Sequence, residues 1–97
     1  MGTADSSMKN ISQVEKYANC LQEVSQYTEQ HFDKLKKQTD MIGQNWSDSQ
    51  FNEFRAQFNE NIIKNVKNIC GTLRRLSEYT KKQCEYHQTA KHHKLKL

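Results

Sequence analysis

Gly43-Gln44-Asn45-Trp46-Ser47-Asp48-Ser49-Gln50-Phe51 is the stretch that decides the fold, because it interrupts two long segments with a helical pattern. It contains the only tryptophan of the chain. Glycine commonly follows the last residue of a helix, so we expect the first helix to end before Gly43. Ser47 with Gln50 matches a capping box, and Asp48 is an alternative N-cap for a second helix. The chain should therefore fold back here as a helical hairpin.

Upstream of this stretch, apolar and small residues recur at alternating steps of three and four. This spacing is a heptad pattern and predicts one long amphipathic helix over residues 9–42. Ser25 and Thr28 fill central positions with small polar groups, which permits close approach of another helix but gives little burial. The patterned positions are Ile11, Val14, Ala18, Leu21, Ser25, Thr28, Phe32, Leu35, Thr39 and Ile42.

Downstream, after a turn expected over residues 43–47, a second amphipathic helix is predicted over residues 48–88. Its steps from Phe54 to Val66 are all of four residues, which is a local break in the heptad. Ile63 and Cys70 lie beside the stripe and make it broader than a contact between two helices needs. The stripe consists of Phe51, Phe54, Phe58, Ile62, Val66, Ile69, Leu73, Leu76, Thr80, Gln83 and His87.

The chain of 97 residues makes one all-α domain at most. Residues 1–8 are expected to be a flexible lead-in and residues 89–97 a basic tail. The net charge of +4 belongs to the last 17 residues, which hold five lysines and one glutamate. No segment approaches the roughly 18 apolar residues of a membrane span, and the N-terminus lacks the pattern of a secretory signal. We expect a cytoplasmic protein, or one exported without a cleaved signal peptide.

A lone hairpin is not expected to cover both stripes, because two helices packed on each other hide only one sector of each. A second hairpin that closes a four-helix bundle would supply the missing cover. We therefore expect a homodimer, or a heterodimer with another small helical protein. The residues expected to bind the partner are Leu21, Phe32, Leu35, Phe51, Phe54, Phe58, Ile62, Val66, Ile69, Leu73 and Leu76.

The chain resembles the WXG family, whose members are leaderless helical hairpins of similar length associated with type VII (ESX) secretion. The resemblance covers residues 9–88 and rests on the length, on the two heptad-patterned helices and on Trp46-Ser47-Asp48-x-x-Phe51-x-x-Phe54. Asp48 stands where the family has glycine. The family's C-terminal export motif, Tyr-x-x-x-Asp/Glu, is missing.

The resemblance implies a non-enzymatic protein of a bacterial secretion system that forms a helical dimer. It would act as a secreted substrate or carrier, or as a chaperone-adaptor that escorts a larger secreted effector. The turn motif of Gly43, Trp46 and Asp48 would then belong to a docking surface. The residues alone indicate a structural tryptophan that caps the open end of the bundle.

No arrangement of residues indicates an enzyme, and no metal site or cofactor is expected. Cys20, Cys70 and Cys84 lack paired spacing and are expected to be small buried hydrophobic residues. The alternative function is a peripheral nucleic-acid or membrane binder that acts through the basic residues 81–97. Because the helices themselves are neutral, we expect no nucleic-acid partner, and we expect no stable membrane insertion.

Overall fold

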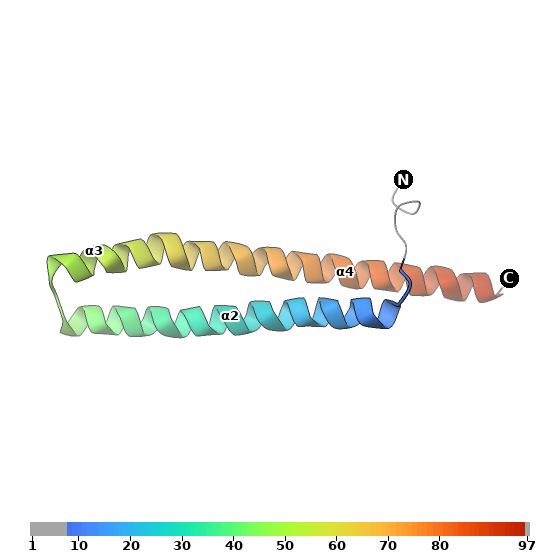
Figure 1. Cartoon of the computed structure of the whole chain (residues 1–97), viewed down its shortest axis with the longest axis horizontal. Helices are drawn as coiled ribbons and strands as arrows, with labels where there is room; N and C mark the ends of the chain where they lie inside the picture. Colours follow the sequence, from blue (N-terminus) through green and yellow to red (C-terminus); the bar gives the residue numbers. More distant parts are fainter. Residues whose placement is uncertain (1–7, 97) are drawn as a thin grey trace.

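Two antiparallel arms joined by a short turn form a rod of 72 × 23 × 15 Å in the computed structural model (Figure 1). The structure describes residues 8–96. One arm is α2 (Ile11–Asn45), and the other consists of α3 (Ser49–Gln57), the π-helix η1 (Phe58–Ile63) and α4 (Lys64–Lys96), which follow one another directly. The predicted all-α helical hairpin is confirmed, and no strand occurs in the described range.

The turn between the arms is fixed by caps at both helix ends. The prediction that the first helix ends before Gly43 is wrong, because α2 continues to Asn45. Trp46 then leaves the helix in an extended conformation. Gly43 does not adopt a positive φ, so it is not the left-handed residue that often ends a helix. Asp48, the alternative of the two predicted caps, is the N-cap of α3 in place of Ser47, because its carboxylate accepts a hydrogen bond of 2.7 Å from the Phe51 N–H.

Mostly small residues form the contact between α2 and the other arm, which we call the seam. Its members repeat every seven residues on each arm, as in a heptad. At its centre the Ser77 hydroxyl donates a hydrogen bond of 2.7 Å to the Ala18 carbonyl. Such short side chains let the two backbones approach closely. The seam consists of the buried Ala18 and Ser25 on α2, continued by the half-buried Phe32, and of the buried Ile63, Cys70, Ser77 and Cys84 on the other arm.

The seam on the second arm lies one residue beyond the predicted stripe. Ile69 and Leu76 belong to the predicted stripe, but both are exposed, and the small residue that follows each of them is buried instead. Closely spaced helices admit the smaller of two neighbouring side chains and leave the larger one outside. The buried position is shifted by one residue at Ile62 and Ile63 as well, where Ile63 is buried and Ile62 exposed, although these two side chains are of equal size.

A similar shift occurs on α2 near the turn. Leu35 and Ile42 are heptad positions of the first helix but are exposed, while Lys36 and Gly43, the residues after them, are half-buried. A straight α-helix has about 3.6 residues per turn, so its line of contact drifts away from a strict heptad. The heptad positions from Ile11 to Phe32 are accordingly buried or half-buried, whereas Leu35 and Ile42, nearer to the turn, are exposed.

The π-helix η1 lies where the sequence steps are all of four residues. Phe51, Arg55, Asn59 and Ile63 turn toward α2 at this interval. Each step of four overshoots a full α-helical turn by about 40°, so three steps rotate the line of contact by about 120°. A π-turn holds one extra residue and takes up about 100° of this rotation. The break in the heptad is thus compensated, and contact with α2 continues on both sides of η1.

The ends of the helices differ from the predicted bounds. α2 begins at Ile11 behind an Asn10 N-cap, rather than at residue 9. α4 continues to Lys96 instead of ending near residue 88, so the predicted basic tail is helical as far as Lys96 and projects past the start of α2 (Figure 1). Of the predicted lead-in, only Met8 is described. None of the helices within residues 8–96 has the length and apolar character that a membrane crossing requires.

Candidate partner-binding face

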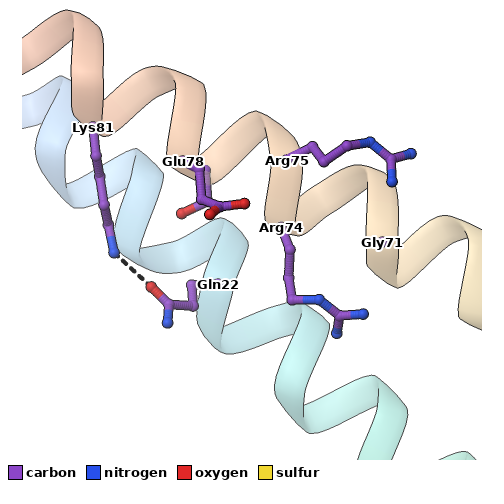
Figure 2. A pocket seen from close by; sticks show the side chains of 7 residues that line it. Gln22, Gly71, Arg74, Arg75, Glu78 and Lys81 are labelled. Carbon is purple, nitrogen blue, oxygen red and sulfur yellow. Dashed lines mark hydrogen bonds between the residues drawn. The ribbon is translucent and has the colours of Figure 1, made fainter.

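Two contacts between the arms define one side of the hairpin. Arg74 Nη1 lies 3.1 Å from Glu29 Oε2. Lys81 donates a hydrogen bond to the side-chain carbonyl of Gln22 (Figure 2). Each of these four residues lies four positions after a seam residue, so the helical period places all of them on the same side. We call this side the polar face: Gln22 and Glu29 on α2, with Arg74 and Lys81 on α4.

The opposite side, from Tyr17 to Leu35 on α2 and from Ile62 to Thr80 on the other arm, holds the residues that directly precede a seam residue and those three positions after one. In antiparallel helices, equal positions relative to the seam lie on the same side, so both arms contribute to one continuous surface. None of its residues is Asp, Glu, Lys or Arg. We call it the apolar face: Tyr17, Leu21, Val24, Thr28, His31 and Leu35 on α2, and Ile62, Val66, Ile69, Leu73, Leu76 and Thr80 on the other arm.

The hairpin itself covers the large side chains of the apolar face poorly. Ile69 is 56% exposed, Tyr17 52% and Val24 48%. Val66 and Leu73, which lie nearer to the seam, are half-buried. Single exposed hydrophobic residues are ordinary on protein surfaces. A row of them without charges, along two adjacent helices, is typical of a surface that another protein covers.

Most of the predicted partner-binding residues lie on this face. The four that do not are phenylalanines near the turn: Phe32, Phe51 and Phe58 are half-buried between the arms, and Phe54 is exposed. Sequence reasoning left Tyr17, Val24 and His31 out of the partner-binding set. Their seven-residue spacing was the signal that would have placed them there. The predicted residues on the face are Leu21, Leu35, Ile62, Val66, Ile69, Leu73 and Leu76.

The predicted turn motif does not act as one unit. Trp46 stacks on Phe51, with ring centroids 4.7 Å apart, and stays 53% exposed. Asp48 is engaged as the N-cap of α3. Gly43 lies in the last turn of α2, before the helix ends at Asn45. Trp46 therefore has a structural contact within the turn and presents the rest of its ring at the end of the rod.

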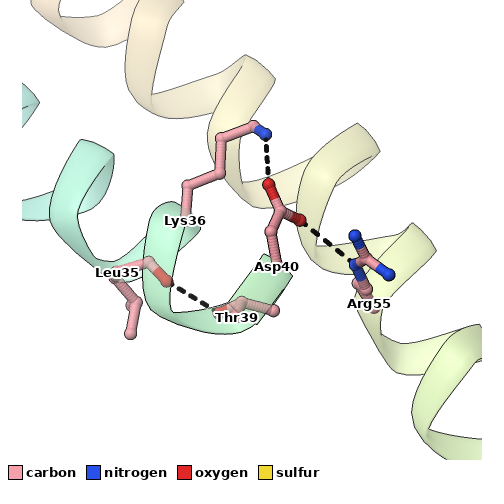
Figure 3. Close-up of polar contacts among 5 residues, drawn as sticks. All are labelled: Leu35, Lys36, Thr39, Asp40 and Arg55. Atoms are coloured by element: carbon pink, nitrogen blue, oxygen red, sulfur yellow. Dashed lines mark hydrogen bonds and ion pairs between the residues drawn. The ribbon is translucent and has the colours of Figure 1, made fainter. Parts of the chain in front are cut away.

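A charged cluster near the turn ties α3 to α2 (Figure 3). Asp40 accepts hydrogen bonds from Lys36 Nζ at 2.9 Å and from Arg55 Nε at 3.1 Å. These two hydrogen bonds lower the pKa of Asp40 below its ordinary value of 3.8. A Cβ at Gly43 would come within 2.5 Å of Arg55 Nη1, so the glycine makes room for the guanidinium. Sequence reasoning missed this cluster, because pairing Asp40 with Arg55 requires the geometry of the turn.

A hollow of about 450 Å³ opens on the polar face (Figure 2). Its Ser77 hydroxyl is engaged with the Ala18 carbonyl, and its Arg74 and Lys81 side chains bind residues of α2. These groups hold the hairpin together. Within the described part of the chain, no three His, Cys, Asp or Glu residues come together as a metal site. The hollow is lined by Gln22, Gly71, Arg74, Arg75, Ser77, Glu78 and Lys81.

The three cysteines divide into two environments. Cys70 and Cys84 are buried in the seam, as predicted, and burial raises the pKa of both thiols above 9.0. Cys20 is exposed, so the prediction of a buried residue is wrong there. It lies two positions after Ala18, which turns it away from the second arm.

Comparisons with protein-family models, with curated proteins and with solved structures gave no match. The resemblance to the WXG family therefore stays a prediction that rests on the residues quoted for it. The assignment of the apolar face does not depend on this resemblance, because it rests on the geometry of the hairpin alone.

Proposed function

We propose that this chain is a WXG-like protein of a specialised bacterial secretion system, where it forms a helical dimer. In this role it is a secreted substrate or carrier, or a chaperone-adaptor of a larger secreted effector. It is a binding module and not an enzyme. One observation carries the proposal: the hairpin leaves most of the large side chains exposed on an apolar face that holds no Asp, Glu, Lys or Arg.

The spacing on the apolar face favours a helical partner. On both arms its residues alternate steps of four and three, which is the arrangement that accepts side chains from another helix as knobs into holes. Two rows lie side by side, so a partner with two helices fits better than a single helix. A second hairpin on this face would complete a four-helix bundle.

The escort role follows from pairing combined with the resemblance. A hairpin that is completed by its partner travels with that partner as one folded unit. Because this chain lacks the Tyr-x-x-x-Asp/Glu motif, the export signal in our proposal belongs to the partner or to the effector.

Light scattering at micromolar concentration tests the pairing. We expect the wild-type chain, alone or with its helical partner, to form a particle heavier than its 11.5 kDa monomer at both low and high salt. Ile69→Asp should shift this particle toward the monomer, because pairing would bury an unpaired carboxylate. Asn68→Asp is the matched control: it adds the same charge at the exposed neighbouring position and should leave the assembly intact. Equal particle masses for the two variants would contradict the proposal.

The competing function, a nucleic-acid or membrane binder acting through residues 81–97, is favoured by the continuation of α4 to Lys96. It predicts a stable monomer whose binding to DNA or to anionic vesicles weakens as salt rises. Deleting residues 89–97 would abolish that binding. Pairing through the apolar face should survive the same deletion.

A further inference from the structure

The two ends of the hairpin are packed differently. At the open end, which is the end opposite the turn, α2 and the other arm meet through the buried members of the seam. These members run from Ala18 to Ser25 and from Ile63 to Cys84. Between residues 26 and 62, which include the turn and all of α3, no residue is buried. Stabilisation by burial is therefore concentrated at the open end, and α3 depends on other contacts.

Asp40 supplies the main polar contact between α3 and α2. Its carboxylate binds Arg55 of α3 and Lys36 of α2 (Figure 3). This is the one ion pair between α3 and α2 within residues 8–96. The absence of a side chain at Gly43 is part of the same contact, because a Cβ there would collide with the Arg55 guanidinium.

The π-helix η1 gives α3 a place to turn relative to α4. Its wider hydrogen-bonded turns are less regular than those of an α-helix. It also contains Asn59, whose Oδ1 is buried and finds no hydrogen-bond partner among the described residues, which disfavours the closed arrangement locally. α2, in contrast, is an uninterrupted α-helix to Asn45. α3 is therefore the element that we expect to shift relative to α2, within the reach that residues 46–48 allow.

We propose that α3 is a hinged arm that turns about η1, with the Asp40–Arg55 pair as the latch that holds it against α2. Opening releases Phe51 and Phe58, which are half-buried in the closed arrangement. Together with the exposed Phe54, they extend the apolar surface toward the turn. The latch thus sets how much apolar surface the protein presents, and it does so whether or not the chain serves in secretion.

Hydrogen exchange of the full chain, followed by mass spectrometry, tests the hinge. In Asp40→Asn we expect the amides of residues 49–57 to exchange about two- to fivefold faster than in the wild type, the range set by a partly exposed ion pair. The amides of residues 64–84 should be unchanged, because the seam holds them independently of the latch.

Gly43→Ala disturbs the same Asp40–Arg55 pair, through Arg55 instead of Asp40. The new methyl group displaces the Arg55 guanidinium, so residues 49–57 should again exchange faster, although alanine favours the helical state of α2 itself. Gly71→Ala is the matched control, because a Cβ there meets only Arg75 Nη1, at 3.4 Å. It should leave the exchange of α3 unchanged.

The single tryptophan gives a second, independent measurement. Trp46 stacks on Phe51 of α3, so an open arm should expose the indole and increase its quenching by acrylamide in the two latch variants. Unchanged or slower exchange of residues 49–57 in both latch variants overturns the hinge. Faster exchange spread equally over residues 49–57 and 64–84 also overturns it, because the hairpin would then open as one unit.

Discussion

The polar face and the apolar face belong to the same two arms, yet only the polar face joins them. On the polar face, Arg74 reaches Glu29 and Lys81 reaches Gln22. On the apolar face, the described residues from Tyr17 to Leu35 and from Ile62 to Thr80 form no hydrogen bond or ion pair between the arms, and most of the large side chains stay exposed. The seam explains the difference, because its small residues bring the backbones so close that the larger neighbours are displaced to one side.

The comparison teaches how the arms of a hairpin can be paired without burying their large side chains. Two arms with large residues between them would bury those residues within one chain. Here the seam and the polar face fix the pairing and register of the arms, while most of the large apolar side chains stay exposed, as we expect of a surface that another molecule covers. Changes in the seam should therefore act on the hairpin, and changes on the apolar face should act on the assembly.

The largest effect is expected from Ser77→Leu. The Ser77 side chain is buried and donates a hydrogen bond to the Ala18 carbonyl, so leucine removes the bond and forces the arms apart. We expect the free energy of unfolding to fall by about 3 kcal/mol. Urea unfolding followed by circular dichroism measures it. Thr72→Leu, the same kind of enlargement at an exposed position, should change stability by less than about 0.5 kcal/mol; equal losses in both variants would mean that the seam is misplaced.

A gain is expected from Gly71→Ala, on the polar side of α4. This glycine lies inside a helix without a positive φ, and a Cβ finds room beside Arg75. Alanine should raise the free energy of unfolding by about 1 kcal/mol. A loss of stability in the same urea experiment would show that the helices approach each other more closely at Gly71 than they do here.

A smaller effect is expected from Arg74→Ala on the polar face. The Arg74–Glu29 pair is more than one-third exposed on both sides, so its removal should cost about 0.2–1 kcal/mol, and less at high salt. The expected assembly mass is that of the wild type. A large fall in assembly mass would mean that the partner binds the polar face, which would reverse the assignment of the two faces.

The smallest effect concerns pH. The pKa of Asp40 is lowered in the folded state by the hydrogen bonds from Lys36 and Arg55. The stabilisation that it provides is therefore present above pH 3.8 and is lost as the pH falls through the lowered pKa. Trp46 fluorescence should report a change near the turn in this acid range. Asp40→Asn should lack that change; an identical acid transition in the variant would assign it to other carboxylates.

The sequence was sufficient to predict the hairpin and the break in the heptad that η1 compensates, and it narrowed the cap of the second helix to Ser47 or Asp48. It was not sufficient to choose between Ile69 and Cys70, or between Leu76 and Ser77, as the inward residue. Apolar periodicity favours the larger member of each pair, whereas the distance between two backbones selects the smaller one. Gly43 shows the same limit: its pattern is that of a helix end, but its role comes from Arg55, twelve residues later and across the turn.

The central claim, that a single hairpin is not the complete folded unit, is tested most directly by thermal unfolding over a hundredfold range of protein concentration, with the mass measured in parallel. We predict a particle heavier than 11.5 kDa whose Tm rises with concentration, because folding and assembly are linked by mass action. A monomer of 11.5 kDa that unfolds cooperatively at the same Tm over the whole range would contradict the account.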